Sequence, residues 1–231
     1  MKHVLIRDLQ LIDYKEAWNE QERLFNELLQ SKMHGKAAEH HHLLLCEHGH
    51  VYTLGQRGHD DNLLVPSSTL DSLGASFVRT NRGGDITYHG PGQLVAYPIC
   101  DLEQLGLGLR SYIDALEQAV IDTLAEYGIA AGRLHGATGV WLSPGQPGIE
   151  RKICAIGVKA SRHITMHGLA LNVNTDMRYF GHINPCGLAD KRVTSMQQEL
   201  QRPIDMAAIK QQLGQHLCHR LGLAELINQP C

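Results

Sequence analysis

The sequence predicts a mixed α/β fold of the α+β type, in which helices pack against a mixed β-sheet within one domain spanning residues 1–231. Three observations lead to this prediction. Three segments carry apolar residues at helical spacing, several short apolar segments between them are typical of strands, and the order is helix, strands, helix, strands, helix. This order differs from the strict strand–helix alternation of a doubly wound fold.

Each predicted helix has one apolar stripe at a spacing of three or four residues. The first stripe is Tyr14, Ala17, Trp18, Leu24, Phe25, Leu28 and Leu29. The second is Tyr112, Ile113, Leu116, Val120 and Tyr127, and the third is Met206, Ile209, Leu213, Leu217 and Leu221. Asp205 is a suitable N-cap for the third helix, and Gly128 and Gly222 are placed to end the second and third.

Short runs rich in Val, Ile and Leu predict the strands, and their apolar character indicates that helices cover at least one face of the sheet. The predicted strands are residues 42–46, 51–54, 76–79, 94–99, 139–142, 153–158 and 169–173. The segment 141–152, "WLSPGQPGIERK", is rich in turn-forming residues, so we expect a loop that leads into a strand rather than a linker between domains.

The composition is that of an ordinary globular protein, with 43% hydrophobic and 19% charged residues. A formal net charge of −3 does not indicate binding to nucleic acid or to an anionic membrane. The N-terminus does not resemble a signal peptide, and we expect a cytoplasmic protein. No two of the six cysteines have Cys-x-x-Cys spacing, so reduced thiols are expected rather than a zinc ribbon or a disulfide scaffold.

The most unusual stretch is "NRGGDITYHGPGQLVAYPI", residues 81–99. Its glycines let backbone amides approach a ligand closely, and the polar residues among them supply hydrogen-bond donors. Two tight turns around a hairpin are the alternative explanation. Neither the dinucleotide fingerprint nor the P-loop pattern is present, which argues against the use of ATP.

The histidine-rich segment 39–50 raises the possibility of a metal site, but the adjacent His40, His41 and His42 point in different directions. No carboxylate or cysteine completes a familiar ligand spacing, so no metal is expected. His89 and His167 lie in glycine-flanked polar segments. A hydrogen-bonded structural imidazole explains each of them as well as a catalytic role does.

One cysteine is placed where burial is least expected. Cys186 lies between Pro185 and Gly187 in "HINPCGLADK", so it should lie on a turn, whereas Cys46 and Cys100 end apolar runs typical of a core. A cysteine nucleophile needs access and a neighbour that favours the thiolate. Cys186 is therefore the candidate nucleophile, with an inert thiol as the alternative.

Two lysines are candidate partners for this thiol. Lys152 and Lys159 flank the predicted strand "KICAIGVK", and strand alternation places Lys152 on the face of Cys154 and Lys159 on the opposite face. Either lysine could instead be an ordinary solvated strand end. Spacing alone does not choose between them.

Taken together, four segments resemble the octanoyltransferases of lipoate biosynthesis, the lipoate biosynthesis protein B family, over about residues 40–200. These segments are "RGGDITYHGPGQLVAYPI", "RKICAIGVKA", "HGLALNVNTDM" and "INPCGL". The resemblance implies a fold similar to the catalytic domains of biotin protein ligases and lipoate ligases. It implies an acyltransferase that needs no cofactor and passes an octanoyl group through a cysteine thioester.

The resemblance also assigns residues. The cysteine of the "NPCGL" motif is Cys186, and the family's catalytic lysine, just before the "Ile-Cys-Ala-Ile-Gly" strand, is Lys152 and not Lys159. The implied substrate-contacting residues form three segments: Arg82, Gly83, Gly84, Asp85, Ile86, Thr87, Tyr88 and His89; Ala155, Ile156 and Gly157; and Gly168, Leu169 and Ala170.

The implied donor is octanoyl-acyl carrier protein, and the implied acceptors are lipoyl domains of 2-oxoacid dehydrogenase E2 subunits and the glycine cleavage H protein. Because these partners are acidic and use one site in turn, we expect a basic rim formed by Arg82, Arg151, Lys159 and Arg162. Three other functions stay open: an ATP-dependent lipoate–protein ligase, a non-catalytic module that binds lipoyl domains, and a cysteine hydrolase.

Overall fold

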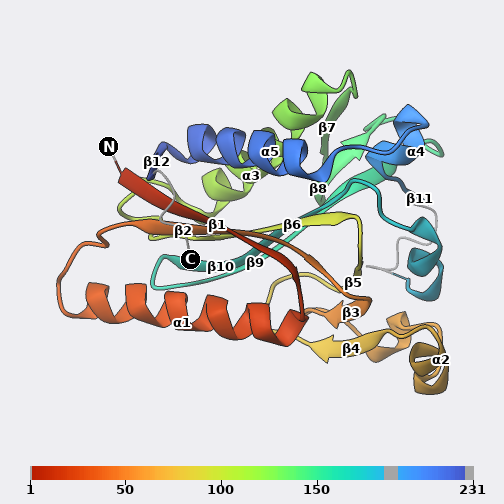
Figure 1. Cartoon of the computed structure of the whole chain (residues 1–231), viewed down its shortest axis with the longest axis horizontal. Helices are drawn as coiled ribbons and strands as arrows, with labels where there is room; N and C mark the ends of the chain where they lie inside the picture. Colours follow the sequence, from red (N-terminus) through yellow and green to blue (C-terminus); the bar gives the residue numbers. More distant parts are fainter. Residues whose placement is uncertain (1, 185–191, 227–231) are drawn as a thin grey trace.

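A mixed β-sheet forms the centre of the molecule (Figure 1). The computed structural model describes residues 2–184 and 192–226. The strand order is β12 (Leu223–Leu226), β1 (Lys2–Ile12), β2 (His41–His48), β6 (Gln93–Ile99), β10 (Ile164–Asn172), β9 (Arg151–Ser161), β8 (Ala137–Leu142) and β7 (Ala131–Leu134), with β11 (Arg192–Val193) paired to β9. Strands β12, β1 and β2 run parallel to one another, as do β11 and β9, and the other pairs are antiparallel.

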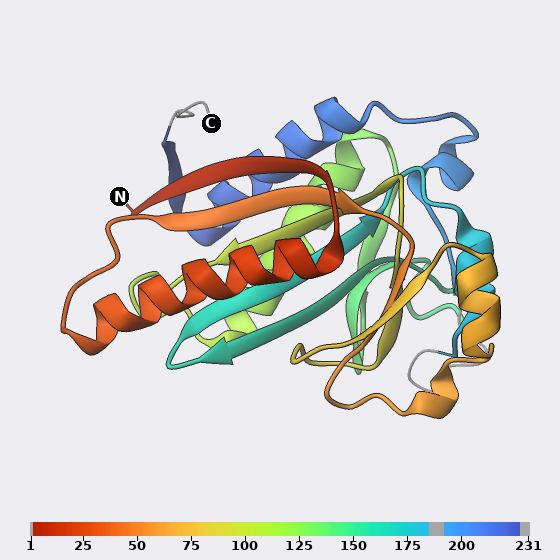
Figure 2. The same cartoon turned by 60° about the horizontal axis from the view of Figure 1, so that its bottom comes forward.

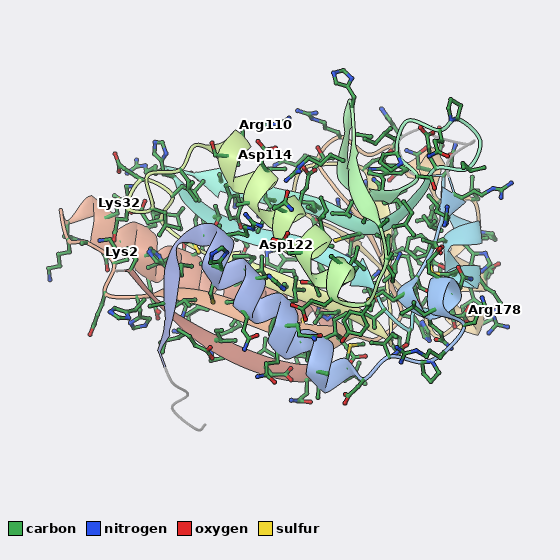
Figure 3. The ribbon with its side chains drawn as sticks, turned by 90° about the horizontal axis from the view of Figure 1, so that it is seen from above. Lys2, Lys32, Arg110, Asp114, Asp122 and Arg178 are labelled. Atoms are coloured by element: carbon green, nitrogen blue, oxygen red, sulfur yellow. The ribbon has the colours of Figure 1, made fainter. Side chains whose placement is uncertain are left out.

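Helices cover both faces of this sheet, as Figures 1 and 2 show. Helices α3 (Leu109–Glu126) and α5 (Met206–Leu221) lie side by side on one face, and their apolar stripes form the larger core with the strands beneath them. Helix α1 (Tyr14–Met33) covers the opposite face and packs on side chains from β2, β6 and β10. In the view of Figure 3, Asp122 lies on α3 where that helix meets α5, and it accepts a hydrogen bond from Arg220 Nε at 2.6 Å.

The helix ends follow from local chemistry. Asp13 and Asp205 cap α1 and α5 by accepting backbone N–H bonds with their side chains. Gly222 ends α5 in the left-handed conformation, at φ 66°, which glycine adopts without a steric penalty. All three predicted helices are therefore confirmed, including the N-cap at Asp205 and the stop at Gly222.

A second, three-stranded sheet stands beside the first at the N-terminal end of α1 (Figures 1 and 2). Its order is β4 (Ser76–Arg79), β3 (Val51–Leu54) and β5 (Ile86–His89). The short elements near it are η1 (Asp60–Asn62), α2 (Ser67–Ser72) and η2 (Met177–His182), and α4 (Met196–Leu200) precedes α5. The glycine-rich segment, residues 81–99, contains β5 of this sheet and β6 of the main sheet, so it links the two sheets.

All seven predicted strands are present, and the mixed α/β fold class is confirmed. Five strands were not predicted: β1, β5, β7, β11 and β12. In β1, charged residues such as Arg7 and Asp8 interrupt the apolar pattern, and its partners β2 and β12 lie elsewhere in the chain. In the part of the chain that the structure describes, no helix is both long and apolar enough to span a membrane.

Candidate active site

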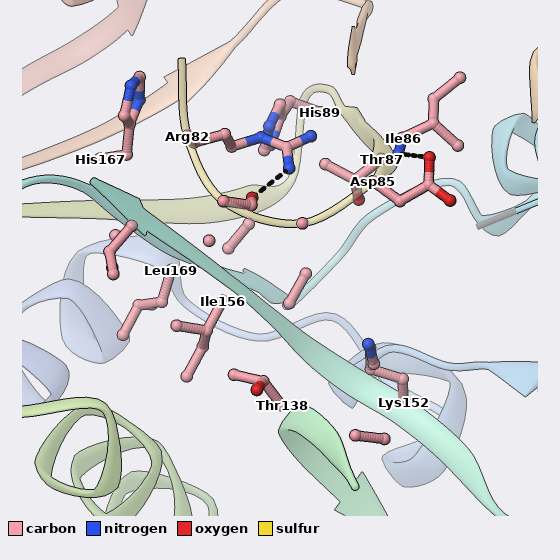
Figure 4. Close-up of a pocket in the computed structure, with 18 of the residues that line it drawn as sticks. Arg82, Asp85, Ile86, Thr87, His89, Thr138, Lys152, Ile156, His167 and Leu169 are labelled. Atoms are coloured by element: carbon pink, nitrogen blue, oxygen red, sulfur yellow. Dashed lines mark hydrogen bonds between the residues drawn. The ribbon is translucent and has the colours of Figure 1, made fainter. Parts of the chain in front are cut away.

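A cavity of about 1180 Å³ lies between the two sheets and is lined by all three predicted contact segments (Figure 4). Two of these segments are direct neighbours in the main sheet. Ala155, Ile156 and Gly157 of β9 pair with Ala170, Leu169 and Gly168 of β10, residue for residue. Antiparallel register thus brings together motifs that are more than ten residues apart in the sequence.

The glycine-rich loop lies directly against β9. The Gly83 N–H donates to the Val158 carbonyl at 2.9 Å, and a Cβ built on Gly157 would come within 2.8 Å of the Gly83 oxygen. Side chains at these positions would hold the two backbones apart. The glycines of both motifs are therefore required by the close approach of loop and strand, which forms one wall of the cavity.

Arg82 lines the cavity but is only 7% exposed. Its guanidinium donates to the Thr53 carbonyl at 2.7 Å, to Thr53 Oγ1 at 2.9 Å and to the Gly83 carbonyl at 3.0 Å. These bonds tie the glycine-rich loop to β3. Arg82 is therefore placed to hold the loop in position against the small sheet.

Beyond the glycines, the loop is fixed by Asp85, whose carboxylate accepts from the Ile86 N–H at 2.6 Å and from Asn62 Nδ2 at 2.7 Å. Ile86 and Thr87 follow along the cavity wall. Tyr88 is the exception, since its side chain is fully buried and its hydroxyl bonds to His50 Nδ1 at 2.7 Å. The structure brings the other residues of this segment together and turns Tyr88 away into the aromatic core of the small sheet.

His89 and His167 both line the cavity and are both buried. His89 Nδ1 lies 2.8 Å from Gln93 Oε1, and His167 Nε2 lies 2.6 Å from Asn81 Oδ1. Burial lowers the pKa of each imidazole to about 3, so both rings are neutral near pH 7. His41 and His42, in the core of β2, have their pKa lowered by burial to about 4.

The two candidate lysines lie seven residues apart on β9, and the predicted placement of Lys152 on the face of Cys154 is wrong. The register shifts between β8 and β9, so Cys154 pairs with Val140 but Lys152 pairs with Trp141, and these neighbours on β8 point to opposite faces. Lys152 lines the cavity, and its Nζ lies 4.7 Å from the ring centroid of Trp141. Lys159 points to the α1 face, where its Nζ lies 5.2 Å from the ring centroid of Phe25. Only Lys152 is therefore placed to act in the cavity.

Cys186 lies outside the described residues, but the chain on either side of it is anchored at the cavity. Before it, the Asn184 N–H donates to the Asn62 carbonyl at 2.8 Å, and Asn62 lines the cavity. After it, Val193 is the β-partner of Lys152, and the Thr194 N–H donates to the Lys152 carbonyl at 2.9 Å. The segment that carries the cysteine therefore starts and ends at the cavity wall.

The four described cysteines are all buried, as predicted for Cys46 and Cys100. Burial raises the pKa of the Cys46, Cys100 and Cys154 thiols well above the ordinary value, and that of Cys218 to about 11. A buried thiol of high pKa is a poor nucleophile. Within the described ranges, no group of three or more His, Cys, Asp or Glu side chains is arranged to hold a metal ion.

The predicted basic rim is wrong in its composition. Arg82 is buried, and Arg151 is held by Glu199, with guanidinium–carboxylate distances of 2.7 Å to both oxygens. The exposed arginines that line the cavity are instead Arg57 and Arg192. Neither forms an ion pair within the part of the chain that the structure describes.

Tyr14, Asn62 and Trp141 are among the residues of the cavity wall that the sequence did not identify as site residues. Tyr14 had been assigned to the apolar stripe of a helix, and Asn62 lies in a loop without a motif. Trp141 lies in the predicted strand 139–142, and its pairing with the strand of Lys152 could have been inferred from their separation by one short loop.

Comparison with solved structures gives the class of fold. An archaeal lipoate protein ligase from Thermoplasma acidophilum, described together with its E2 lipoyl domain, superposes with a TM-score of 0.71 at 15% identity, covering 100% of this chain and 87% of that one. A biotin protein ligase from Aquifex aeolicus gives a TM-score of 0.51 at 13% identity, covering 96% and 70%. The fold is therefore that of the lipoate and biotin ligase catalytic domains.

The sequence comparisons then give the family. The profile described as "Lipoyl protein ligase A/B catalytic domain" matches residues 13–218, and the chain belongs to this family. The octanoyltransferase of Bacteroides fragilis strain YCH46 is 56% identical over 210 residues, which are 91% of this chain and 94% of that protein. The octanoyltransferase of Bacteroides thetaiotaomicron is 54% identical over 92% of each chain. The activity is octanoyl transfer in lipoate biosynthesis, which confirms the predicted acyltransferase.

Proposed function

We propose that the protein takes the octanoyl group from octanoyl-acyl carrier protein onto the sulfur of Cys186 and then delivers it to a lysine of a lipoyl domain, with Lys152 as proton carrier. The observation that carries the proposal is the position of Lys152 in a cavity lined by all three contact segments. The sequence supports it, because Cys186 follows two residues after Asn184, whose N–H donates to the carbonyl of the cavity-lining Asn62.

The cavity offers an apolar surface for the acyl chain. Ile113, Ile156, Val158 and Leu169 line it and pack against the larger core. Burial of the seven methylene and methyl carbons of an octanoyl chain, at about 0.8 kcal/mol each, contributes up to roughly 5 kcal/mol before losses. This contribution favours an apolar acyl chain over a polar one.

In the first half-reaction, Lys152 favours the thiolate of Cys186, which attacks the carbonyl carbon of the incoming thioester. The new carbon–sulfur bond forms as the bond to the carrier's thiol breaks, and that thiol leaves with the proton. In the second half-reaction, Lys152 accepts a proton from the attacking amine, an amide forms and the Cys186 thiol is released. Backbone N–H groups of the glycine-rich segments are the candidate donors to the oxyanion.

Thioester exchange is nearly neutral in free energy and amide formation from a thioester is downhill, so the cycle needs no ATP. The acceptors are lipoyl domains of 2-oxoacid dehydrogenase E2 subunits and the glycine cleavage H protein. Support for this class of partner comes from the similar fold of the T. acidophilum ligase, which is described together with its E2 lipoyl domain.

The experiment that tests the proposal is transfer without ATP. The protein is incubated with octanoyl-acyl carrier protein and an unmodified lipoyl domain, and intact mass of the lipoyl domain reports one added octanoyl group. Transfer that requires ATP and free octanoate would instead identify a lipoate–protein ligase. Release of free octanoate would identify a hydrolase, and binding of both partners without a product would identify a non-catalytic module.

A further inference from the structure

We infer that Trp141 is a positioning residue for Lys152: its ring holds the lysine ammonium at the cavity wall, and Gly139 and Glu117 fix the strand on which the ring stands. This inference rests on the proposed role of Lys152. Trp141 is 1% exposed, and its Nε1 donates to the Ala137 carbonyl at 3.1 Å, so its ring cannot change orientation freely. The ammonium of Lys152 lies 4.7 Å from the ring centroid, within the range of a cation–π interaction.

A β-bulge brings this pair together. Val140 of β8 opposes Cys154 of β9, so regular antiparallel pairing would place Lys152 opposite Leu142. The register shifts between Val140 and Trp141 instead, and Lys152 becomes the direct partner of Trp141. Bulges redirect side chains and are frequent beside active sites. Here the bulge places the Lys152 ammonium over the ring of Trp141. With regular pairing, the two side chains would lie apart.

Gly139 gives the lysine side chain its path along β8. Its φ is +119°, and a Cβ built there would lie 3.5 Å from Lys152 Cε and 2.5 Å from the Cys154 carbonyl oxygen. Any side chain at this position would push β8 and β9 apart and move the ring of Trp141 relative to the ammonium. Glycine is therefore required where the two strands approach beneath Lys152.

A buried carboxylate holds this part of β8 against α3. Glu117 is 4% exposed; its Oε1 accepts from the Gly139 N–H at 3.0 Å and its Oε2 accepts from Arg133 Nε at 2.9 Å. Arg133 belongs to β7, so one carboxylate links α3 to both strands of the β7–β8 hairpin. We define the lysine platform as Glu117, Gly139 and Trp141, a rigid base that sets the position of Lys152.

The platform predicts that Lys152 is protected from acylation by an amine reagent, because the ring favours the charged form and only the neutral amine reacts. The test is competitive labelling with acetic anhydride at pH 8, followed by peptide mass spectrometry. The Cys186→Ser chain is used throughout, since it cannot pass an acetyl group from thiol to lysine. Lys159, over the ring of Phe25 in α1 and outside the cavity lining, is the internal reference.

We expect Trp141→Phe, which keeps a weaker aromatic face, to raise the labelling of Lys152 relative to Lys159 about threefold, and Trp141→Leu about fivefold. If Trp141→Leu fails to fold, all of its lysines are labelled faster than in the wild type. The labelling ratio of Trp141→Phe is then the test of the inference. A Lys152 to Lys159 ratio that stays at the wild-type value in the folded variants would overturn the inference.

Steady-state transfer with the Cys186-containing chain gives the second readout. A positioning role predicts a lower kcat with the KM for octanoyl-acyl carrier protein unchanged. A raised KM with unchanged kcat and unchanged labelling would show that Trp141 is only a wall of the acyl pocket. A separate variant tests the proposed function itself. If Lys152 is not the proton carrier, Lys152→Ala retains octanoyl transfer, whatever the labelling ratio of Lys152 to Lys159.

Discussion

The contact between the glycine-rich loop and β9 gives a sharp test of how the cavity is built. A methyl group added at Gly157 would meet the Gly83 oxygen at 2.8 Å and Arg82 Cδ at 3.2 Å. The nearer contact is with backbone, so the loop itself must move. Overpacking of this kind costs about 1–3 kcal/mol. We expect Gly157→Ala to lower the free energy of unfolding by that amount and to reduce octanoyl transfer at least tenfold.

Gly214→Ala in α5 is the matched control. A methyl group there would meet its nearest neighbours, Leu45 Cδ1 and Ile6 Cδ1, at 3.8 and 3.9 Å, which is ordinary contact. Alanine also favours the helix interior over glycine by about 1 kcal/mol. Urea denaturation should therefore show the control as more stable than the wild type, with full transfer activity. If Gly157→Ala were as stable and as active as the control, the loop would not be held against β9 as described.

Three further predictions follow from the site. Burial lowers the pKa of five histidines, so below pH 6.5 they bind protons in the unfolded chain but not in the folded protein. The free energy of unfolding should therefore drop by about 1.4 kcal/mol per histidine per pH unit, down to the depressed pKa of each. These histidines are His41, His42, His48, His89 and His167. Urea denaturation at pH 7.5 and 5.5 measures this drop, and equal stability at both would refute it. Replacing Arg57 and Arg192 by glutamine should raise the KM for octanoyl-acyl carrier protein at low salt with little change in kcat. Unchanged kinetics would show that the carrier protein does not dock against these two arginines. Lys152→Ala should abolish transfer, whereas Lys159→Ala should stay within about twofold of wild type; a reversed result would assign the wrong lysine.

The fold was predicted well where the signal is local. Apolar stripes and capping residues located α1, α3 and α5, and short apolar runs located seven strands. Strands β1, β5, β7, β11 and β12 were missed. For β1 the reason is that its pairing with β2 and β12 depends on tertiary contacts that no local pattern encodes. That the chain forms a single domain in the cytoplasm stays a prediction.

The sequence motifs predicted which segments form the site, but not how those segments lie relative to one another. The sequence does not show that Ala155–Gly157 would pair with Gly168–Ala170, or that a bulge would place Lys152 over Trp141. Arg82 was wrongly placed in the exposed basic rim because arginines usually lie at the surface. In the structure it is buried and donates to backbone and hydroxyl oxygens. Cys186 was singled out by its turn-forming neighbours. The choice of Lys152 over Lys159 depended on the family resemblance until the structure placed Lys152 at the cavity wall and Lys159 over Phe25.

The central claim is that the octanoyl group passes through the sulfur of Cys186. The most direct measurement is the intact mass of the protein after incubation with octanoyl-acyl carrier protein alone, with the adduct mapped by peptide mass spectrometry and its bond tested with hydroxylamine. The account predicts one octanoyl group on Cys186, removed by neutral hydroxylamine and absent from Cys186→Ser. An octanoyl group on another residue, or full transfer by Cys186→Ser without any covalent intermediate, would contradict it.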